Sequence, residues 1–141
     1  MPDTPADEAP RFSPVIALLA VSATWEAQLA AELRDLGIST RKFGLLGHIG
    51  AEPGISFSEL ARRSRITVQS AHAAVHALVD DGLVADATAQ AGAASDLSVT
   101  ERGAQVLRNA QDRLERLDES LSQSLPRVAE SLGGIRAGVI E

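Results

Sequence analysis

Three closely spaced arginines are the groups in this chain whose chemistry is easiest to interpret. Arg62, Arg63 and Arg65 are always charged at physiological pH, and each guanidinium can bind a phosphate through two parallel N–H donors. Arg41 and Lys42 add two basic groups earlier in the chain. Basic clusters of this kind hold the backbone phosphates of nucleic acids. We therefore interpret the three arginines as the main phosphate contacts, and Arg41 and Lys42 as further candidates.

The segment after the arginines carries uncharged side chains that can read the edges of bases. Gln69 is suited to adenine, and Ser70 and His72 to several bases. Ala73 offers a methyl contact to thymine. A helix that turned these groups outward would present them to the major groove. The predicted DNA-binding residues are Arg62, Arg63, Arg65, Thr67, Gln69, Ser70, His72, Ala73 and His76.

The histidines could instead form a metal site. His72 and His76 stand four residues apart, a spacing at which one face of a helix can chelate an ion. However, His48 falls on a different predicted helix, the chain has no cysteine, and the sequence shows no further cluster of Asp, Glu or His. We therefore predict no metal and no other cofactor, and we assign His72 and His76 to the DNA-facing surface.

Catalytic motifs are absent from the sequence. There is no Gly-rich phosphate loop, no His-Glu-x-x-His and no Gly-x-Ser-x-Gly. The adjacent acids Asp80 and Asp81 fall at a predicted helix end, and Asp118 and Glu119 fall on the polar side of a long helix, where solvation explains them. The sequence therefore predicts no catalytic residues and no enzyme.

Local signals place the arginines in a helix-turn-helix. Ser56 can cap a helix over about 57–63, and Glu59, three residues later, is spaced to reach back to that cap. Thr67 can cap a second helix over 68–81. The three arginines would then lie at the end of the first helix and in the turn before the second.

The second helix has one apolar face and a clear stop. Its apolar residues recur at the three-and-four spacing of a buried face. They are Ala71, Ala74, Val75, Leu78 and Val79. Gly82 should end the helix, because glycine takes a left-handed cap without steric cost. The β-compatible segments 83–86 and 96–99 then predict a hairpin around the small-residue loop 87–95.

These features resemble the MarR family of winged-helix transcriptional regulators. Three motifs carry the resemblance, and with the flanking helices it covers nearly the whole chain after about Ser13. They are Ser-Glu-Leu-Ala-Arg-Arg at 58–63, Val-x-x-Leu-x-x-x-Gly-Leu-Val at 75–84, and Leu-Ser-Val-Thr-Glu-Arg-Gly at 97–103. The last is similar to the family's junction between the wing and a long helix.

The resemblance implies a mainly α fold with a small β-hairpin wing. It places a winged helix-turn-helix at 39–99 between long dimerisation helices at 14–36 and 100–137, in a single domain over 14–137. It also implies a sequence-specific regulator, a homodimeric repressor on a palindromic double-stranded operator. Residues 1–13 and 138–141 would be tails, the first of them acidic, proline-rich and disordered.

The two flanking helices carry apolar stripes that agree with dimerisation. One stripe includes Val15, Leu18, Leu19, Ser22, Trp25, Leu29 and Leu33, and the other Val106, Leu107, Leu114, Leu117, Leu121 and Leu125, before Pro126 ends or kinks the helix. The stripes could instead complete an intramolecular core. Charged residues after Ala23 interrupt any membrane span of about 20 residues, so we predict a soluble, cytoplasmic protein.

The distribution of charge leaves two interpretations open. The net charge is −6, yet Arg41 to Arg65 contains five basic residues against Glu52 and Glu59. No Lys or Arg occurs over 66–100, and the loop at 91–96 lacks the arginine common in MarR-type wings. Either neutral groups read the bases while the arginines supply affinity, or the chain is a winged-helix dimer with weakened or lost DNA binding that binds a protein or ligand.

A ligand is implied by the resemblance alone. MarR-type regulators often bind small aromatic molecules in a cleft between the dimerisation helices and the winged domain. The corresponding neighbours here would be Trp25, Arg41, Phe43 and His48. Trp25 and Phe43 are equally suited to a hydrophobic core.

Overall fold

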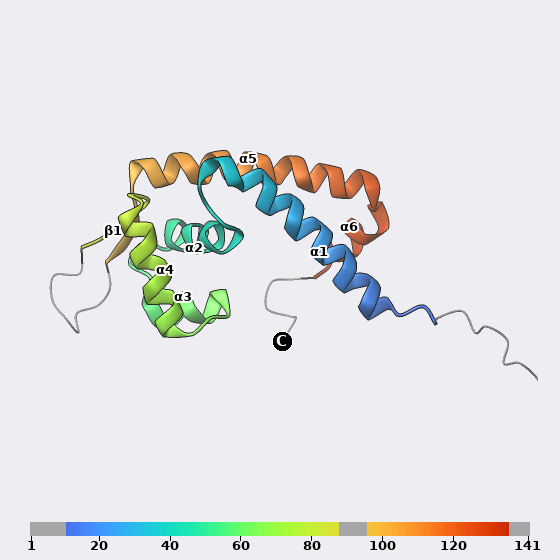
Figure 1. The fold of residues 1–141 in the computed structure, drawn as a ribbon, viewed down its shortest axis with the longest axis horizontal. Helices are drawn as coiled ribbons and strands as arrows, with labels where there is room; N and C mark the ends of the chain where they lie inside the picture. Colours follow the sequence, from blue (N-terminus) through green and yellow to red (C-terminus); the bar gives the residue numbers. More distant parts are fainter. Residues whose placement is uncertain (1–10, 88–95, 136–141) are drawn as a thin grey trace, which may run out of the picture.

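The computed structural model describes residues 11–87 and 96–135 and has the predicted architecture of helices with one small hairpin. Its elements are α1 (Pro14–Leu33), a 3-10 turn (Arg34–Leu36), α2 (Thr40–Ala51), α3 (Phe57–Ser64), α4 (Val68–Asp80), β1 (Val84–Asp86), β2 (Leu97–Val99), α5 (Glu101–Ser124) and α6 (Pro126–Gly133). Figure 1 shows α5 along one edge, with the hairpin, α2, α3 and α4 gathered near its start and α6 at its far end.

The largest differences between predicted and observed boundaries occur in the two flanking helical segments, and elsewhere the ends differ by one residue. The first helix was expected to reach residue 36, but its α-helical part ends at Leu33, and a 3-10 turn continues to Leu36 before Gly37 takes φ 73°. The segment expected over 100–137 is divided before Pro126 into α5 and α6, and α6 spans Pro126–Gly133. Residues 1–10 of the tail expected over 1–13, residues 88–95 of the loop expected over 87–95, and residues 136–141 lie outside the described part of the chain.

Five of the helices begin at a hydroxyl side chain. Each hydroxyl oxygen accepts a hydrogen bond from the backbone N–H three residues later, which satisfies one of the free donors of the first turn. These pairs are Ser13 with Ile16, Ser39 with Lys42, Ser56 with Glu59, Thr67 with Ser70, and Thr100 with Gly103, at 3.0–3.3 Å. The caps predicted at Ser56 and Thr67 are therefore confirmed.

Helix α4 ends at a left-handed glycine, as predicted. Gly82 has φ 74°, and its N–H donates to the carbonyl oxygen of Val79 at 2.9 Å. The N–H of Leu83 donates to the carbonyl oxygen of Leu78 at 2.9 Å. This pair of bonds is a Schellman motif, which turns the chain sharply from the helix into β1.

The hairpin, the end of α4 and the start of α5 form one connected unit. The antiparallel strands pair Val84 with Val99 and Asp86 with Leu97. At their base the Thr100 hydroxyl donates to the Gly82 carbonyl oxygen at 2.6 Å, and the Thr100 N–H donates to the Leu83 carbonyl oxygen at 3.0 Å. The position of the hairpin is thus tied to both of the helices that flank it.

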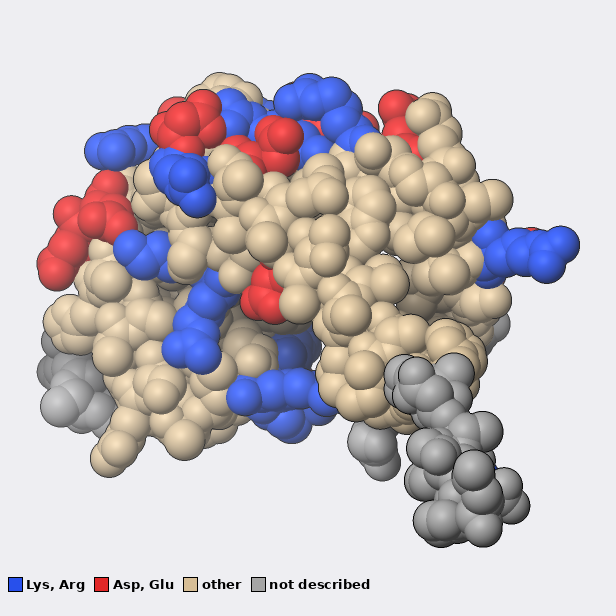
Figure 2. All heavy atoms as spheres, turned by 45° about the vertical axis from the view of Figure 1, so that its right-hand side comes forward, with Lys and Arg blue, Asp and Glu red and all other residues tan. Residues whose placement is uncertain are grey.

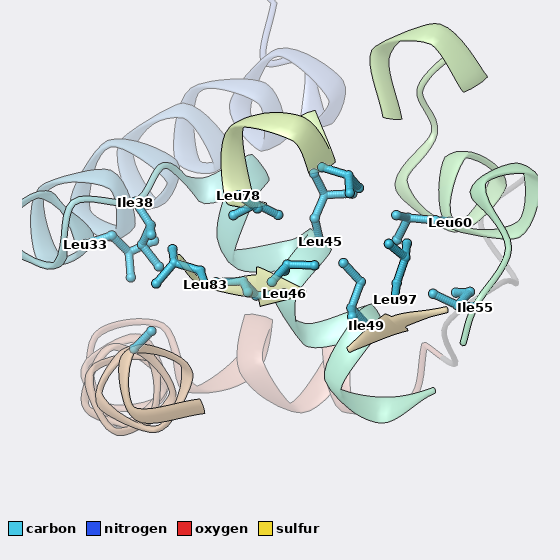
Figure 3. Packing of buried hydrophobic residues seen from close by; sticks show 13 residues of the cluster. Leu33, Ile38, Leu45, Leu46, Ile49, Ile55, Leu60, Leu78, Leu83 and Leu97 are labelled. Carbon is cyan, nitrogen blue, oxygen red and sulfur yellow. The ribbon is translucent and has the colours of Figure 1, made fainter. Parts of the chain in front are cut away.

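The core surrounds α2. Leu45, Leu46 and Ile49 of this helix are fully buried, and Figure 3 shows them at the centre of the cluster. Every other helix of the winged region contributes to the same core, and so do the end of α1 and the hairpin. The fully buried large side chains are Leu33, Leu45, Leu46, Ile49, Leu60, Leu78 and Leu97. Burial of these groups fixes the angle between α3 and α4.

The long helices leave much apolar surface uncovered in the single chain. Val15 is 64% exposed and Leu18 60% exposed, and Leu132 on α6 is also exposed. A hollow of about 440 Å³ lies between α1, α5 and α6, with Trp25, Leu114 and Leu121 among its apolar walls. Figure 2 shows a face of the molecule on which uncharged side chains occupy a broad central area. The stripe on α1 is therefore covered at its Leu33 end and remains exposed around Val15 and Leu18.

Helix α1 also bears on the membrane prediction. Together with its 3-10 extension it spans Pro14–Leu36, which has the length and mean hydropathy (1.3) of a membrane-crossing helix. Glu26 and Glu32 do interrupt the helix as expected, so it meets this criterion by length and mean hydropathy alone, which is weak evidence for a membrane span. In the folded chain Leu33, at the end of α1, is fully buried, and α1 contacts α2 and α5.

Candidate nucleic-acid interface

Helices α3 and α4 form a helix-turn-helix with an unusual residue in the turn. Arg65 has φ 55°, and it is the one residue other than glycine with positive φ in the described ranges 11–87 and 96–135. The following N–H, of Ile66, donates to the Ala61 carbonyl oxygen at 3.0 Å and closes the turn. A left-handed non-glycine residue costs roughly 1–2 kcal/mol. An arginine at a position that favours glycine is consistent with a functional use of its side chain.

Helix α4 separates its residues into a buried and an outward face. Ala71 and Leu78 are fully buried, and Val75 is 2% exposed. The outward face contains exposed residues predicted to contact DNA: Gln69, His72, Ala73 and His76. These four positions were chosen from the sequence, and the structure brings them together on one surface.

Two other predicted contacts lie at the start of α4. Thr67 is exposed and Ser70 is half-buried. Their hydroxyl groups bond to each other, since Thr67 Oγ1 donates to Ser70 Oγ at 2.9 Å while it accepts from the Ser70 N–H. Both hydroxyl groups therefore take part in the cap of α4.

His72 has an aromatic neighbour that the sequence analysis missed. The ring of Phe57, the first residue of α3, stacks on the imidazole of His72 with ring centroids 3.9 Å apart and planes inclined by 17°. Phe57 is half-buried and packs against the hydrophobic core. Nothing in the local pattern marks this contact, because it depends on the angle at which α3 meets α4.

Arg62 and Arg63, both predicted to bind phosphate, are paired with carboxylates in the structure. Arg62 donates to both oxygens of Glu59 at 2.5 and 2.9 Å, and Arg63 Nε donates to Glu59 Oε1 at 2.8 Å. Arg63 also contacts Glu52 Oε2 at 2.5 Å. The expectation that the Glu59 carboxylate reaches back to the Ser56 cap was therefore wrong, because the arginines one helical turn later attract it more strongly.

These ion pairs predict a pH-dependent contribution of Glu59 to stability. The hydrogen bonds from Arg62, and then those from Arg63, lower the pKa of Glu59 from 4.5 to about 2. A depressed carboxyl pKa stabilises the folded state above the unfolded pKa of 4.5, and this stabilisation is lost as the pH falls towards 2. We expect Glu59→Gln to lower Tm by a few degrees at most at neutral pH, since the pairs are exposed.

The measurement is thermal unfolding of the wild type and of Glu59→Gln, monitored by circular dichroism at neutral pH and at several values below pH 4.5. The difference in Tm should shrink as the pH falls through this range. A difference that stays constant with pH would contradict the assignment of the lowered pKa to Glu59.

The side chains of Arg41 and Lys42 have different neighbours in the structure. Lys42 Nζ is 3.0 Å from Asp81 Oδ2, an ion pair that joins the start of α2 to the end of α4. Arg41 faces a cleft of about 470 Å³ that also contains Arg65. Of these two further phosphate candidates, only Arg41 is therefore brought near the arginines of the helix-turn-helix.

The same cleft contains part of the predicted ligand set. Arg41 and His48 both line it, but Phe43 packs against the core and Trp25 lines the separate hollow between α1, α5 and α6. The remaining walls are formed by Glu26, Thr40, Gly44, Leu45, Ser64, Arg65 and Ile66. The Ser64 hydroxyl oxygen is buried without a hydrogen-bond partner, so the cleft holds an unsatisfied polar group beside several charged ones.

Comparisons with known proteins agree with this arrangement. A model of the MarR family matches residues 36–92. The HTH-type transcriptional repressor Rv2887 of Mycobacterium tuberculosis is 31% identical over 125 residues, covering 82% of this chain and 90% of the relative.

Solved structures agree as well. Crystal structures of Rv2887 with DNA and with salicylic acid superpose with TM-scores of 0.70 and 0.66, at 25% and 27% identity. They cover 87% and 86% of this chain, and 99% and 92% of the respective Rv2887 chains. The Staphylococcus aureus regulator MepR shares the fold with a TM-score of 0.73 at 13% identity, over 89% of this chain and 100% of MepR. With a relative more than 30% identical over most of both chains, this chain belongs to the MarR family.

Proposed function

We propose that this protein is a sequence-specific, DNA-binding transcriptional repressor that acts as a homodimer. One observation carries the proposal: α4 buries Ala71, Val75 and Leu78 and presents Gln69 and His72 on its free face. A surface helix that follows a helix-turn-helix turn and exposes hydrogen-bonding groups of this kind is suited to the major groove. The proposal is supported by the similar repressor Rv2887, whose crystal structures include a complex with DNA.

In the proposed complex α4 lies in the major groove. Gln69, Ser70 and His72 contact base edges, while Arg62 and Arg65 contact the flanking phosphates. Arg63 joins them, and DNA phosphates then replace Glu59 as the partner of Arg62 and replace Glu59 and Glu52 as the partners of Arg63. Because the attraction to phosphate is electrostatic, affinity depends steeply on salt.

Two copies are needed to complete this complex. The exposed apolar residues of α1 and α6, and the hollow between α1, α5 and α6, supply a surface that a second copy can cover. A two-fold axis through such an interface would set two α4 helices about 34 Å apart, one turn of duplex, and would match a palindromic operator.

A small-molecule effector is a second component of the proposal. Arg41, His48 and Arg65 give the cleft beside α2 basic groups, with Glu26 as an acidic counterpart. An aromatic carboxylate is the chemistry that such a cleft would take, and the complex of Rv2887 with salicylic acid supports this class. Because Arg65 also lies in the turn before α4, an anion in the cleft would compete with phosphate for the same side chain.

The test is binding of the purified protein to DNA from upstream of its own gene, compared with a scrambled duplex, at low and at physiological salt. We expect a dimer by light scattering, selective binding that weakens steeply with salt, and weaker binding when salicylate is added. A folded dimer with no selective binding at either salt concentration would instead favour a winged-helix module that binds a protein or a ligand.

A further inference from the structure

We propose that Phe57 is a positioning residue for base recognition, and that it acts by holding the imidazole of His72 in a fixed orientation. The inference deepens the proposed DNA binding and rests on it. Phe57 does not reach the DNA in this proposal. Its role is to make His72, on the neighbouring helix, a preorganised contact.

The anchoring of Phe57 is the first step of the argument. Ser56 caps α3 immediately before it, through the hydrogen bond from the Glu59 N–H at 3.1 Å. The Phe57 ring packs against the buried core, which also contains Leu60 of the same helix. A side chain held by a capped backbone and a packed core has little rotational freedom, so it can serve as a rigid support.

The stack is the second step. The Phe57 and His72 rings are nearly parallel, with centroids 3.9 Å apart. The N–H and the lone pair of an imidazole lie in the plane of its ring, so covering one face leaves its hydrogen-bonding edge available. His72 is itself exposed on the outward face of α4. The stack therefore restricts the ring without using the groups that would contact a base.

The third step is the consequence for binding. A free surface histidine loses rotamer freedom when it is ordered against a base, and this loss reduces the net gain from the contact. A histidine already held against Phe57 loses less rotamer freedom when it contacts the base. We therefore expect His72 to discriminate at one base pair more strongly than an unsupported histidine would.

The experiment measures discrimination at single base pairs. Binding of the full-length protein to operator variants with one base pair changed identifies the position at which His72→Ala loses selectivity. Phe57→Leu keeps an apolar side chain in the core but removes the stacking face. We expect it to reduce discrimination at that same position by on the order of tenfold, to leave the other positions unchanged, and to add nothing to His72→Ala in the double variant.

Two variants provide matched controls. Phe43→Leu makes the same substitution in another half-buried phenylalanine of this core, on α2, and should leave the discrimination at that position intact. Phe57→Tyr keeps the stacking face and should also retain the discrimination at that position. Thermal unfolding of all variants confirms that each binding measurement is made on folded protein.

The outcomes separate this inference from the proposed function. If the wild type is selective and Phe57→Leu lowers affinity equally for all sequences, with the His72 position still discriminated, the positioning role is overturned. If the wild type binds operator and scrambled DNA equally, the proposed DNA recognition fails and this inference fails with it. The wild-type measurement therefore tests the proposed DNA recognition, and the Phe57→Leu measurement on a selective wild type tests the positioning role.

Discussion

Changing Arg62, Arg63 and Arg65 together to alanine is expected to lower operator affinity about a hundredfold at low salt, if each phosphate contact contributes about 1 kcal/mol. The slope of log affinity against log salt should fall in magnitude by about two to three, since each phosphate contact that is lost removes nearly one unit. The loss should be similar for operator and scrambled DNA, because phosphates carry no sequence information. Titrations at several salt concentrations, with fluorescence anisotropy as the readout, measure both quantities.

Two single substitutions also test whether the arginines contact phosphates. Glu59→Gln releases Arg62 and Arg63 from their shared carboxylate, so it should raise affinity and steepen the salt dependence. Arg65→Gly should weaken binding while it stabilises the fold, because glycine takes φ 55° without strain. If the triple alanine variant binds operator as the wild type does, the arginines are not the phosphate contacts.

These arginines illustrate how far the sequence determined the site. Their position at a turn before an amphipathic helix followed from local signals, namely the Ser56 and Thr67 caps and the apolar spacing along α4. The spacing of Glu59 to Arg62 and Arg63, three and four residues, was also visible in the sequence. The capping-box motif offered Glu59 a competing partner, and charge pairing prevailed over the cap.

Contacts between elements could not be predicted in the same way. The stack of Phe57 on His72 depends on the crossing of α3 and α4, which the packing of Leu60 and Leu78 in the core determines. The ligand set was divided for a similar reason. The orientation of α2 about its axis places Phe43 against the core and His48 in the cleft. Sequence periodicity predicts which residues share a helix face, but it does not predict which neighbouring element covers that face.

The long helices show a further limit. Their apolar stripes were evident in the sequence, but the single chain leaves Leu18 and Leu19 60% exposed. Amphipathic periodicity predicts that a face will be covered, and it does not say whether the cover belongs to the same chain. The exposed surface of the folded chain is what favours a second copy over an intramolecular core.

Gly103→Ala, at the start of α5, is expected to be strongly destabilising for a small substitution. A Cβ at this position would lie 2.0 Å from the Leu83 carbonyl oxygen and 2.8 Å from Val99 Cγ1. The Leu83 carbonyl oxygen accepts the hydrogen bond from the Thr100 N–H at the base of the hairpin, so it cannot move away without disturbing that bond.

The gain in helix propensity from alanine, at most about 1 kcal/mol, does not offset this clash. We expect a loss of about 3 kcal/mol or more, and a Tm lower by roughly 10 °C. Selective DNA binding should weaken as well, because the hairpin and α4 share this junction.

The matched control is another glycine-to-alanine change within a helix. A Cβ on Gly47 of α2 would meet nothing within 4 Å, so Gly47→Ala should raise stability by about 0.5–1 kcal/mol through helix propensity. Thermal unfolding of the two variants beside the wild type measures shifts of opposite sign. If Gly103→Ala were as stable as Gly47→Ala, the close approach of α5 to Leu83 could not be the contact that fixes the hairpin against α4.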